Sequence, residues 1–255
     1  MIKNPTTFEE MKNQVICSDC LDIMKLIPDN SIDMILCDLP YGTTACKWDT
    51  IIPFEPLWEV YKRIIKDNGA IVLTASQPFT SKLVMSNLKM FKYEWVWEKT
   101  QPSNSLLANK QPLKYTENII VFYLKQPTYN PQKWKGEINH GRNDSGEDMK
   151  SEIIGSEIKR TKTNKSGIKY PKNIIKIPAI RQDKLHPTQK PVALFEYLIK
   201  TYTSAGDVVL DNCAGSFTTS IASENLKRNW ICIEKEEKYC EIGIKRIKEN
   251  RDRLR

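Results

Sequence analysis

The chain has 255 residues, which suits one large domain or one domain with an insertion. Hydrophobic residues make up 40% and charged residues 27%, and no apolar run reaches the roughly 18 residues that cross a bilayer. Because the N-terminus also lacks the apolar core of a signal peptide, we expect a soluble cytoplasmic protein. The net charge is +8, and the seven cysteines are odd in number and scattered, so neither a disulfide framework nor a metal site is expected.

Short apolar runs alternate with helix-like segments along the chain, which is typical of a parallel α/β sheet. The run at 32–37 is almost entirely apolar, as expected for a strand covered on both faces. Strands are predicted at residues 15–17, 32–37, 70–75, 93–97, 119–124, 208–210 and 230–233, with 93–97 and 119–124 as an antiparallel edge. Helices are predicted at residues 21–27, 55–66, 191–202, 216–226 and 236–248, and Asp67-Asn68-Gly69 is predicted to stop the second helix and turn the chain.

Residues 126–185 interrupt this alternation. They are rich in Lys, Asn, Gly, Ser and Pro, and they carry thirteen Lys or Arg against seven Asp or Glu. A local basic surplus favours a polyanionic partner, although a merely solvated basic face would have the same composition. We interpret this segment as an inserted, partly mobile recognition region between a first half, 1–125, and a second half, 186–255.

The first motif with chemical content is Asp38-Leu39-Pro40-Tyr41-Gly42, directly after the strand predicted at 32–37. Ligands gather at the carboxyl ends of strands in open α/β sheets. The nitrogen of an aromatic amine is a poor nucleophile, because its lone pair is delocalised into the ring. The Asp38 carboxylate and the Pro40 carbonyl could hold its N–H groups and draw it toward tetrahedral geometry, while the carboxylate stabilises the developing positive charge. Tyr41 offers a face on which an everted base can stack. A strand-end turn, in which Asp38 caps and Tyr41 packs, is the alternative.

The second motif is residues 208–219, which combine a strand, a turn of small residues and a helix start. Small residues let the backbone approach a cofactor, and the free N–H groups of a helix N-terminus favour an anionic group. Glu234 ends the next predicted strand, 23 residues after Asp211, and an acid at about that distance can hold the ribose hydroxyls of an adenosine. The glycine patterns of dinucleotide and ATP sites are missing, so nucleoside binding fits better. An ordinary βαβ turn with a surface glutamate is the alternative.

These motifs together resemble the permuted, β-class DNA amino-methyltransferases. Asp38-Leu39-Pro40-Tyr41 is similar to the Asp-Pro-Pro-Tyr catalytic motif of that family, and Asp211–Thr218 is similar to its cofactor loop, Asp-Pro-x-x-Gly-Ser-Gly-Thr. The segment from His186 to Pro191 (HPTQKP) resembles the one whose residues line the methionine end of the cofactor, and Ser18-Asp19 resembles the opening segment, in which Asp19 would contact the adenine of the cofactor. The order, with the catalytic motif first, the recognition region next and the cofactor loop last, is that of the β-class.

The resemblance implies an α/β, Rossmann-like fold with a mostly parallel seven-stranded sheet, helices on both faces and a circularly permuted motif order, in a single domain over 1–255. It implies methyl transfer from S-adenosylmethionine to N6 of an adenine flipped out of double-stranded DNA, by direct in-line displacement. An aspartate at position 38 resembles the adenine enzymes, since the cytosine-amine enzymes usually carry serine there. N4 of cytosine, adenine in RNA, and a DNA-binding protein without catalysis are the alternatives. A homodimer and a cognate restriction enzyme are compatible with the family.

The resemblance also assigns site residues. Catalysis falls to Asp38, Pro40 and Tyr41. The cofactor is expected to contact Asp19, Asp38, His186, Thr188, Lys190, Asp211, Ala214, Gly215, Ser216, Phe217, Thr218 and Glu234. The basic side chains considered for contacts with nucleic acid are Lys99, Lys110, Lys114, Lys159, Arg160 and Lys162, with a solvated surface role as the alternative.

Three positions depart from the family pattern. Leu39 replaces the first proline of the catalytic motif and Asn212 replaces a common proline of the cofactor loop, and both changes are expected to be tolerated. Phe217 replaces the second glycine of the loop, where the backbone approaches the ligand. A phenylalanine lacks the freedom of glycine at positive φ, so Phe217 is expected either to point away or to weaken cofactor binding.

Overall fold

The structure is a computed structural model that describes residues 5, 7–46, 48–137, 149–151, 156–158, 166–180, 182 and 184–254. The chain divides into two compact units. The first consists of residues 1–130 and 173–255 and contains the large sheet, and the second consists of residues 131–172. In the part of the chain that is described, no helix combines the length and hydrophobicity needed to span a membrane.

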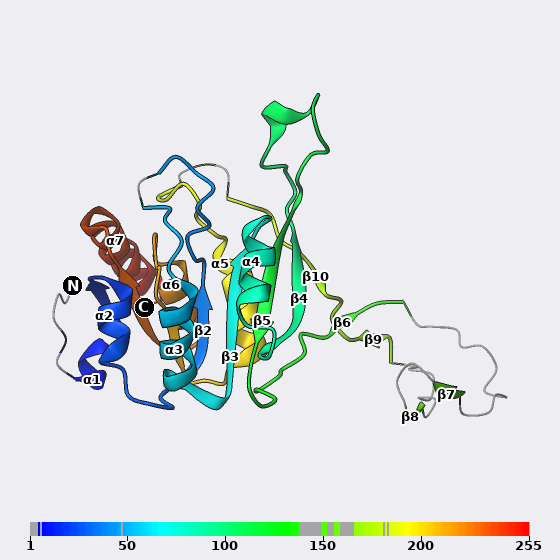
Figure 1. The fold of residues 1–255 in the computed structure, drawn as a ribbon, viewed down its shortest axis with the longest axis horizontal. Coiled ribbons are helices and arrows are strands. Elements are labelled where there is room, and N and C mark those ends of the chain that lie inside the picture. Colours follow the sequence, from blue (N-terminus) through cyan, green and yellow to red (C-terminus); the bar gives the residue numbers. More distant parts are fainter. Residues whose placement is uncertain are drawn as a thin grey trace. The chain divides into compact units, whose positions relative to one another are not determined.

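The first unit is built on a sheet of eight described strands, in the order β1, β12, β11, β2, β3, β5, β4, β10 (Figure 1). The first five strands in this order run parallel, whereas β5 pairs antiparallel with both β3 and β4. The predicted antiparallel edge is therefore confirmed. The seven predicted strands are present as β1 (Gln14–Cys17), β2 (Ile32–Cys37), β3 (Ile65–Ala75), β4 (Phe91–Glu98), β5 (Thr116–Phe122), β11 (Val208–Asp211) and β12 (Asn229–Glu234).

The eighth strand, β10 (Ile174–Lys176), is an addition to the predicted seven. It lies inside the segment 126–185 and pairs parallel with β4 at the edge of the sheet. Ile175 is buried while Ile174 is exposed, so β10 is a short, half-covered edge strand. Its apolar run is too short to stand out in a lysine-rich segment, and the ordered sheet therefore extends into the predicted insert.

The beginning of β3 also differs from the prediction. Helix α3 (Phe54–Ile64) ends before the expected boundary, and residues 67–69 lie inside β3 instead of forming a helix stop and turn. The register between β2 and β3 shifts in this region, so the extra residues of β3 form a bulge. A Cβ at Gly69 would lie 2.9 Å from the carbonyl oxygen of Asp33, which explains the glycine at this close approach.

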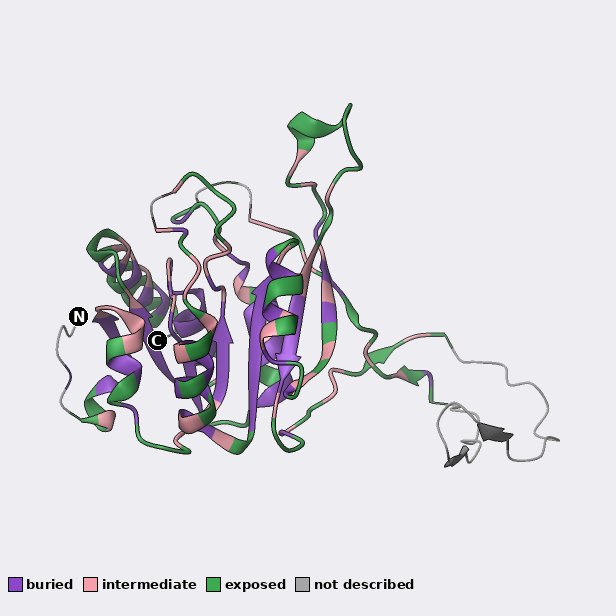
Figure 2. Ribbon diagram, viewed as in Figure 1, coloured by how far each residue is buried: buried purple, intermediate pink, exposed green. Residues whose placement is uncertain are grey.

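Helices cover both faces of the sheet, as predicted, and the strands between them are buried (Figure 2). Alternate residues of β3 face opposite layers: Ile71 and Leu73 pack with α2, α3 and α4, whereas Ala70 and Val72 pack with α5. Helices α6 and α7 extend the α5 layer, α6 over β11 and β12 and α7 over β12 and β1. The remaining helices are α1 (Phe8–Met11), α2 (Cys20–Lys25), α4 (Phe79–Ser86), the 3₁₀ turn η1 (Ser105–Leu107), α5 (Val192–Tyr202), α6 (Thr218–Asn225) and α7 (Glu237–Leu254).

The second unit contains two short antiparallel ribbons among its described residues. One pairs β6 (Trp134–Lys135) with β9 (Ile168–Lys169), and the other pairs β7 (Met149–Ser151) with β8 (Ser156–Ile158). Two-stranded ribbons of this length bury little apolar surface, so the large sheet, not this unit, provides the hydrophobic core.

Candidate active site

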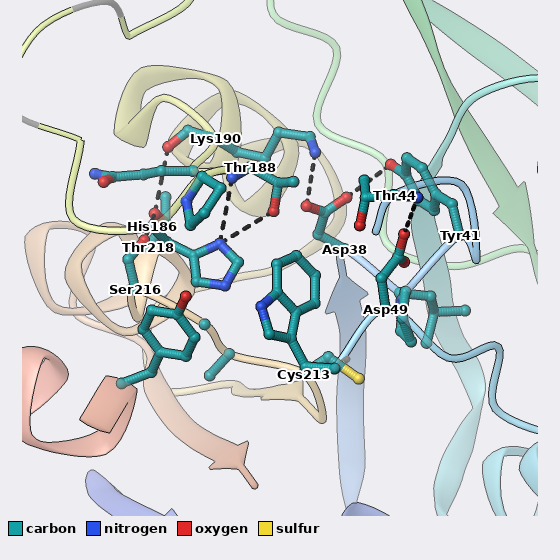
Figure 3. Close-up of a pocket in the computed structure, with 18 of the residues that line it drawn as sticks. Asp38, Tyr41, Thr44, Asp49, His186, Thr188, Lys190, Cys213, Ser216 and Thr218 are labelled. Atoms are coloured by element: carbon teal, nitrogen blue, oxygen red, sulfur yellow. Dashed lines mark hydrogen bonds and ion pairs between the residues drawn. The ribbon is translucent and has the colours of Figure 1, made fainter. Parts of the chain in front are cut away.

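Four neighbouring parallel strands end at the same edge of the sheet, and each ends at or near an acidic residue. Strand β2 leads into Asp38, β11 ends at Asp211, β12 ends at Glu234, and β1 leads through Ser18 to Asp19. All four acids line one cavity of about 790 Å³, part of which is seen in Figure 3. The cavity therefore lies at the carboxyl ends of the strands, where open α/β sheets bind ligands.

Both carboxylate oxygens of Asp38 are hydrogen-bonded. The Tyr41 hydroxyl donates to Oδ1 over 2.7 Å, and the Thr74 hydroxyl donates to the same oxygen. The Lys190 ammonium lies 2.6 Å from Oδ2, so Asp38 is held between Tyr41 and Lys190 (Figure 3). The Asp38 side chain is 18% exposed. It is therefore fixed in orientation and still reaches the cavity.

One face of the Tyr41 ring is occupied by another aromatic ring. Tyr41 stacks on Phe79 with the centroids 5.1 Å apart and the planes inclined by 23°. Burial raises the pKa of Tyr41, and the charges of Asp38 and Glu117 raise it further, so its hydroxyl stays protonated. Any stacking of a base on Tyr41 is restricted to its other face, and Pro40, the preceding residue, also lines the cavity.

The loop after the catalytic motif is held together by Asp49. Its Oδ1 accepts the backbone N–H of Gly42 over 2.9 Å, and its Oδ2 accepts those of Thr43 and Thr44 over 2.9 and 2.7 Å. Burial acts to raise the pKa of Asp49, but these donors outweigh it and lower the pKa. The sequence analysis missed Asp49. The available signal was an aspartate a few residues after Gly42, because aspartates in loops often accept backbone N–H groups.

His186 lies between two aromatic rings that the sequence analysis also missed. Its ring centroid is 4.9 Å from that of Trp48 and 4.3 Å from that of Tyr239. The backbone N–H of Thr188 donates to Nδ1 over 3.3 Å, so the neutral ring carries its proton on Nε2. Burial lowers the pKa of His186, which favours this neutral form. All three rings line the cavity.

Two of the acidic residues predicted to contact the cofactor already accept hydrogen bonds from neighbouring groups of the protein. Asp211 is buried, and its carboxylate accepts the N–H of Cys213 over 3.1 Å and the Thr219 hydroxyl over 2.5 Å. Burial raises the pKa of Asp211 to about 6. Asp19 caps α2 by accepting the N–H of Leu21 over 3.0 Å. Each carboxylate therefore stabilises the loop or helix on which it lies.

Glu234 connects the end of β12 to the loop that follows β11. Its Oε2 accepts the N–H of Gly215 over 2.7 Å, and its Oε1 accepts the N–H of Glu236 over 2.9 Å. Burial raises the pKa of Glu234. Each carboxylate oxygen has two lone pairs, so Glu234 retains capacity for hydroxyl donors in the cavity. Gly215 has a φ of +50°, which glycine adopts without strain.

Every residue predicted to contact the cofactor lines the cavity except Phe217. Phe217 has a φ of 60° and a ψ of 38°, so a phenylalanine does occupy the left-handed position of the loop. Its ring is fully buried and packs on Gly243 of α7, where an added Cβ would lie 2.2 Å from the ring. Of the two expected outcomes, the side chain therefore points away from the cavity.

Lys99, considered for contacts with nucleic acid, lies inside the cavity instead of on an open surface. It is 5% exposed, and its ammonium donates to Oε1 of Glu117 over 2.9 Å and to the Ser103 hydroxyl over 3.2 Å. A phosphate contact would require Lys99 to leave Glu117. The sequence analysis missed Glu117, because nothing in the chain around β5 indicates which lysines it faces.

The other basic candidates differ in placement. Lys110 is exposed in the segment that joins β4 to β5, and Lys114 donates to the Ser76 hydroxyl at the end of β3. Lys159, Arg160 and Lys162 lie outside the described residues.

The sheet order and the cavity at its carboxyl edge define the class of protein, an α/β protein with a ligand site at the ends of its parallel strands. A family model for DNA methylases of the N6/N4 type matches residues 32–245, and the chain belongs to this family. The resemblance inferred from the motifs is therefore confirmed, and the chain is a DNA methylase.

Named relatives support the same assignment. The chain is 29% identical to DNA adenine methyltransferase YhdJ of Escherichia coli K12, over 95% of this chain and 85% of that protein. It is 27% identical to Type II methyltransferase M.HpaI of Haemophilus parainfluenzae, over 93% of this chain and 74% of that protein.

Solved structures share the fold. The M1.HpyAVI–SAM complex has a TM-score of 0.63 and 24% identity, over 92% of this chain and 98% of that one. The cytosine-N4-specific PvuII DNA methyltransferase has a TM-score of 0.62 and 16% identity, over 94% of this chain and 91% of that one. The predicted α/β fold class is confirmed.

Proposed function

We propose that this DNA methylase transfers a methyl group from S-adenosylmethionine to N6 of adenine in double-stranded DNA. The observation that carries the proposal is the position of Asp38, whose oriented carboxylate reaches the same cavity as Glu234 and Gly215. The names of relatives support adenine as the target base, since YhdJ is a DNA adenine methyltransferase. An aspartate at position 38 supports it as well.

The residues present fit a nucleoside cofactor. Glu234 has lone pairs for the two ribose hydroxyls, Gly215 lets the backbone approach, and Asp19 borders the cavity beside them. The cavity of about 790 Å³ falls within the range of small-molecule sites. When bound, S-adenosylmethionine supplies an electrophilic methyl carbon on a positively charged sulfur.

On the base side, the roles follow from charge. Asp38 accepts an N–H of the amine and stabilises the positive charge that develops on nitrogen, and the Pro40 carbonyl accepts the second N–H. Tyr41 and Thr74 orient Asp38 through their hydroxyls. The proton that nitrogen loses after transfer passes to Asp38 and then to solvent.

The remaining assignments concern the partner. Lys110, Lys114 and the basic insert 126–185 contact the DNA backbone and bases, within a single domain whose catalytic half is 1–125 and whose cofactor half is 186–255. A cognate restriction enzyme is part of the proposal, because the relative M.HpaI is a Type II methyltransferase, and a homodimer is carried over from the family resemblance alone.

Labelled cofactor and duplex DNA, followed by digestion to nucleosides, test the base assignment. We expect the label on 6-methyladenine. Label on 4-methylcytosine, or transfer to RNA alone, would contradict the proposal.

The role of Asp38 is tested separately by substitution. Asp38→Ala should lower turnover by roughly 10²–10³-fold, because the transition state loses its carboxylate, and cofactor affinity measured by calorimetry should fall by a much smaller factor. Asp22→Asn is the control, since Asp22 forms an exposed pair with Lys25 and no other ion pair with the residues that the structure describes. An Asp38→Ala enzyme with wild-type turnover would remove Asp38 from the mechanism.

A further inference from the structure

A row of alternating charges lies along the cavity next to Asp38. The Lys190 ammonium is 2.6 Å from Oδ2 of Asp38 and 3.5 Å from Oε2 of Glu117, and the Lys99 ammonium is 2.9 Å from Oε1 of Glu117. The side chains of Lys190 and Lys99 are 7% and 4% exposed. Buried charges are costly unless they are paired, and here two ammonium groups balance two carboxylates.

The two oxygens of Glu117 are unequally occupied. Oε1 accepts a hydrogen bond from Lys99, whereas Oε2 is buried and has no hydrogen-bond partner among the described residues. A buried carboxylate oxygen without a hydrogen bond is costly, and the nearest ammonium is that of Lys190. A shift of that ammonium by roughly 0.7 Å would bring it to an ordinary hydrogen-bond distance from Oε2.

At the other end of the row, the pairing of Asp38 with Lys190 is unfavourable for the proposed reaction. Oδ1 of Asp38 accepts two hydroxyls, and Oδ2 accepts the Lys190 ammonium. The amine of a target base must share Oδ2 of Asp38 with that ammonium, because Oδ1 already accepts two hydroxyls, and the amine nitrogen becomes positively charged. An ammonium at Oδ2 competes for that acceptor and places a like charge beside the reacting nitrogen.

We propose that Glu117 is a positioning residue that draws the Lys190 ammonium away from Asp38 when the amine of the target base enters. This inference rests on the proposed function. Without a base, Lys190 neutralises Asp38. When the amine arrives, the ammonium keeps its proton and moves onto Oε2 of Glu117, and Oδ2 of Asp38 accepts an N–H of the amine. No covalent bond changes, and Lys99 holds Glu117 in place throughout.

Single-turnover methylation of duplex DNA, with the target site identified by modification-sensitive sequencing, tests the inference in Glu117→Gln, Lys190→Met and the double variant. Glu117→Gln should slow transfer at least about tenfold, because Lys190 then remains on Asp38. Its affinities for cofactor and duplex should stay within about twofold of the wild type. Adding Lys190→Met should recover part of the lost rate, because no ammonium then competes for Asp38.

If Glu117 had only a structural role, adding Lys190→Met would lower the transfer rate further instead of recovering it, because the two losses of rate would accumulate. A double variant slower than Glu117→Gln, or a Glu117→Gln enzyme as fast as the wild type, would overturn the inference. Glu94→Gln is the matched control, because Glu94 lies on the adjacent strand, is exposed and pairs with Asn118. If Glu117→Gln fails to fold, Glu117→Asp replaces it: the shorter side chain keeps the charge but holds it farther from Lys190, so transfer should be slower than in the wild type, and an unchanged rate would refute the proposal. A wild-type enzyme that transfers no label would refute the proposed function itself, and the inference with it.

Discussion

Phe217 is a residue whose backbone conformation and packing must be explained together. Non-glycine residues in strained backbone conformations cost on the order of 1–3 kcal/mol and persist only where the surroundings hold them. Here the surroundings are the α7 backbone at Gly243, which leaves room for the ring, and a fully buried core. The glycine that the loop lacks at position 217 is thus matched by a glycine on α7, and the Phe217 ring occupies the space that a side chain at position 243 would need.

Gly243→Ala tests this pairing at the residue scale. In an ordinary helix this change stabilises by about 0.5–1 kcal/mol, because glycine is a poor helix former. At Gly243 the new Cβ would lie 2.2 Å from the Phe217 ring, so we expect a net destabilisation of roughly 1–3 kcal/mol in denaturant unfolding. In a Phe217→Ala background the same change should be neutral or stabilising. A stabilised Gly243→Ala single variant would contradict the packing of Phe217 on α7.

At the scale of elements, the loop between β2 and α3 is preorganised by one carboxylate. Asp49 accepts three backbone N–H groups of residues 42–44, and the adjacent Trp48 packs on His186 from the segment before α5. Two segments that are distant in the sequence therefore share one wall of the cavity. Fixing this wall before the ligand arrives lowers the ordering cost of binding.

Asp49→Asn should weaken cofactor binding without preventing folding. The amide keeps one acceptor oxygen and presents an NH₂ group to N–H donors, so at least one charge-assisted hydrogen bond is lost. We expect the dissociation constant for S-adenosylmethionine, measured by calorimetry, to rise about tenfold. Asp67→Asn is the control, because Asp67 pairs with Lys125 on the exposed surface and should stay within about twofold. Equal affinities in the two variants would show that the loop needs no preorganisation.

For the molecule as a whole, the sequence predicts what depends on local pattern. The seven strands follow from short runs of mostly apolar residues, and Asp38 and Glu234 follow from their positions at strand ends. Contacts between distant segments are different: the pairing of Lys190 with Asp38, or of Glu117 with Lys99, joins residues that only the sheet order brings together. A short edge strand such as β10 depends in the same way on a partner that sequence cannot specify.

The net charge of +8 predicts that the affinity of the whole molecule for a polyanion depends on salt concentration. If duplex DNA is the partner, binding releases counterions, and the logarithm of the affinity falls linearly with the logarithm of the salt concentration.

Lys110 is exposed on the segment between β4 and β5, and Gln101, Ser103 and Ser105 of the same segment line the cavity. Lys110→Gln should therefore weaken binding to all sequences alike and reduce the salt slope by roughly one unit in fluorescence titrations. Lys62→Gln removes an equal charge from the last turn of α3. This turn leads into the start of β3, at the end of the strands away from the cavity, so the slope should stay unchanged. Equal slopes for both variants would mean that only the overall charge attracts DNA, and that the segment beside the cavity makes no phosphate contact.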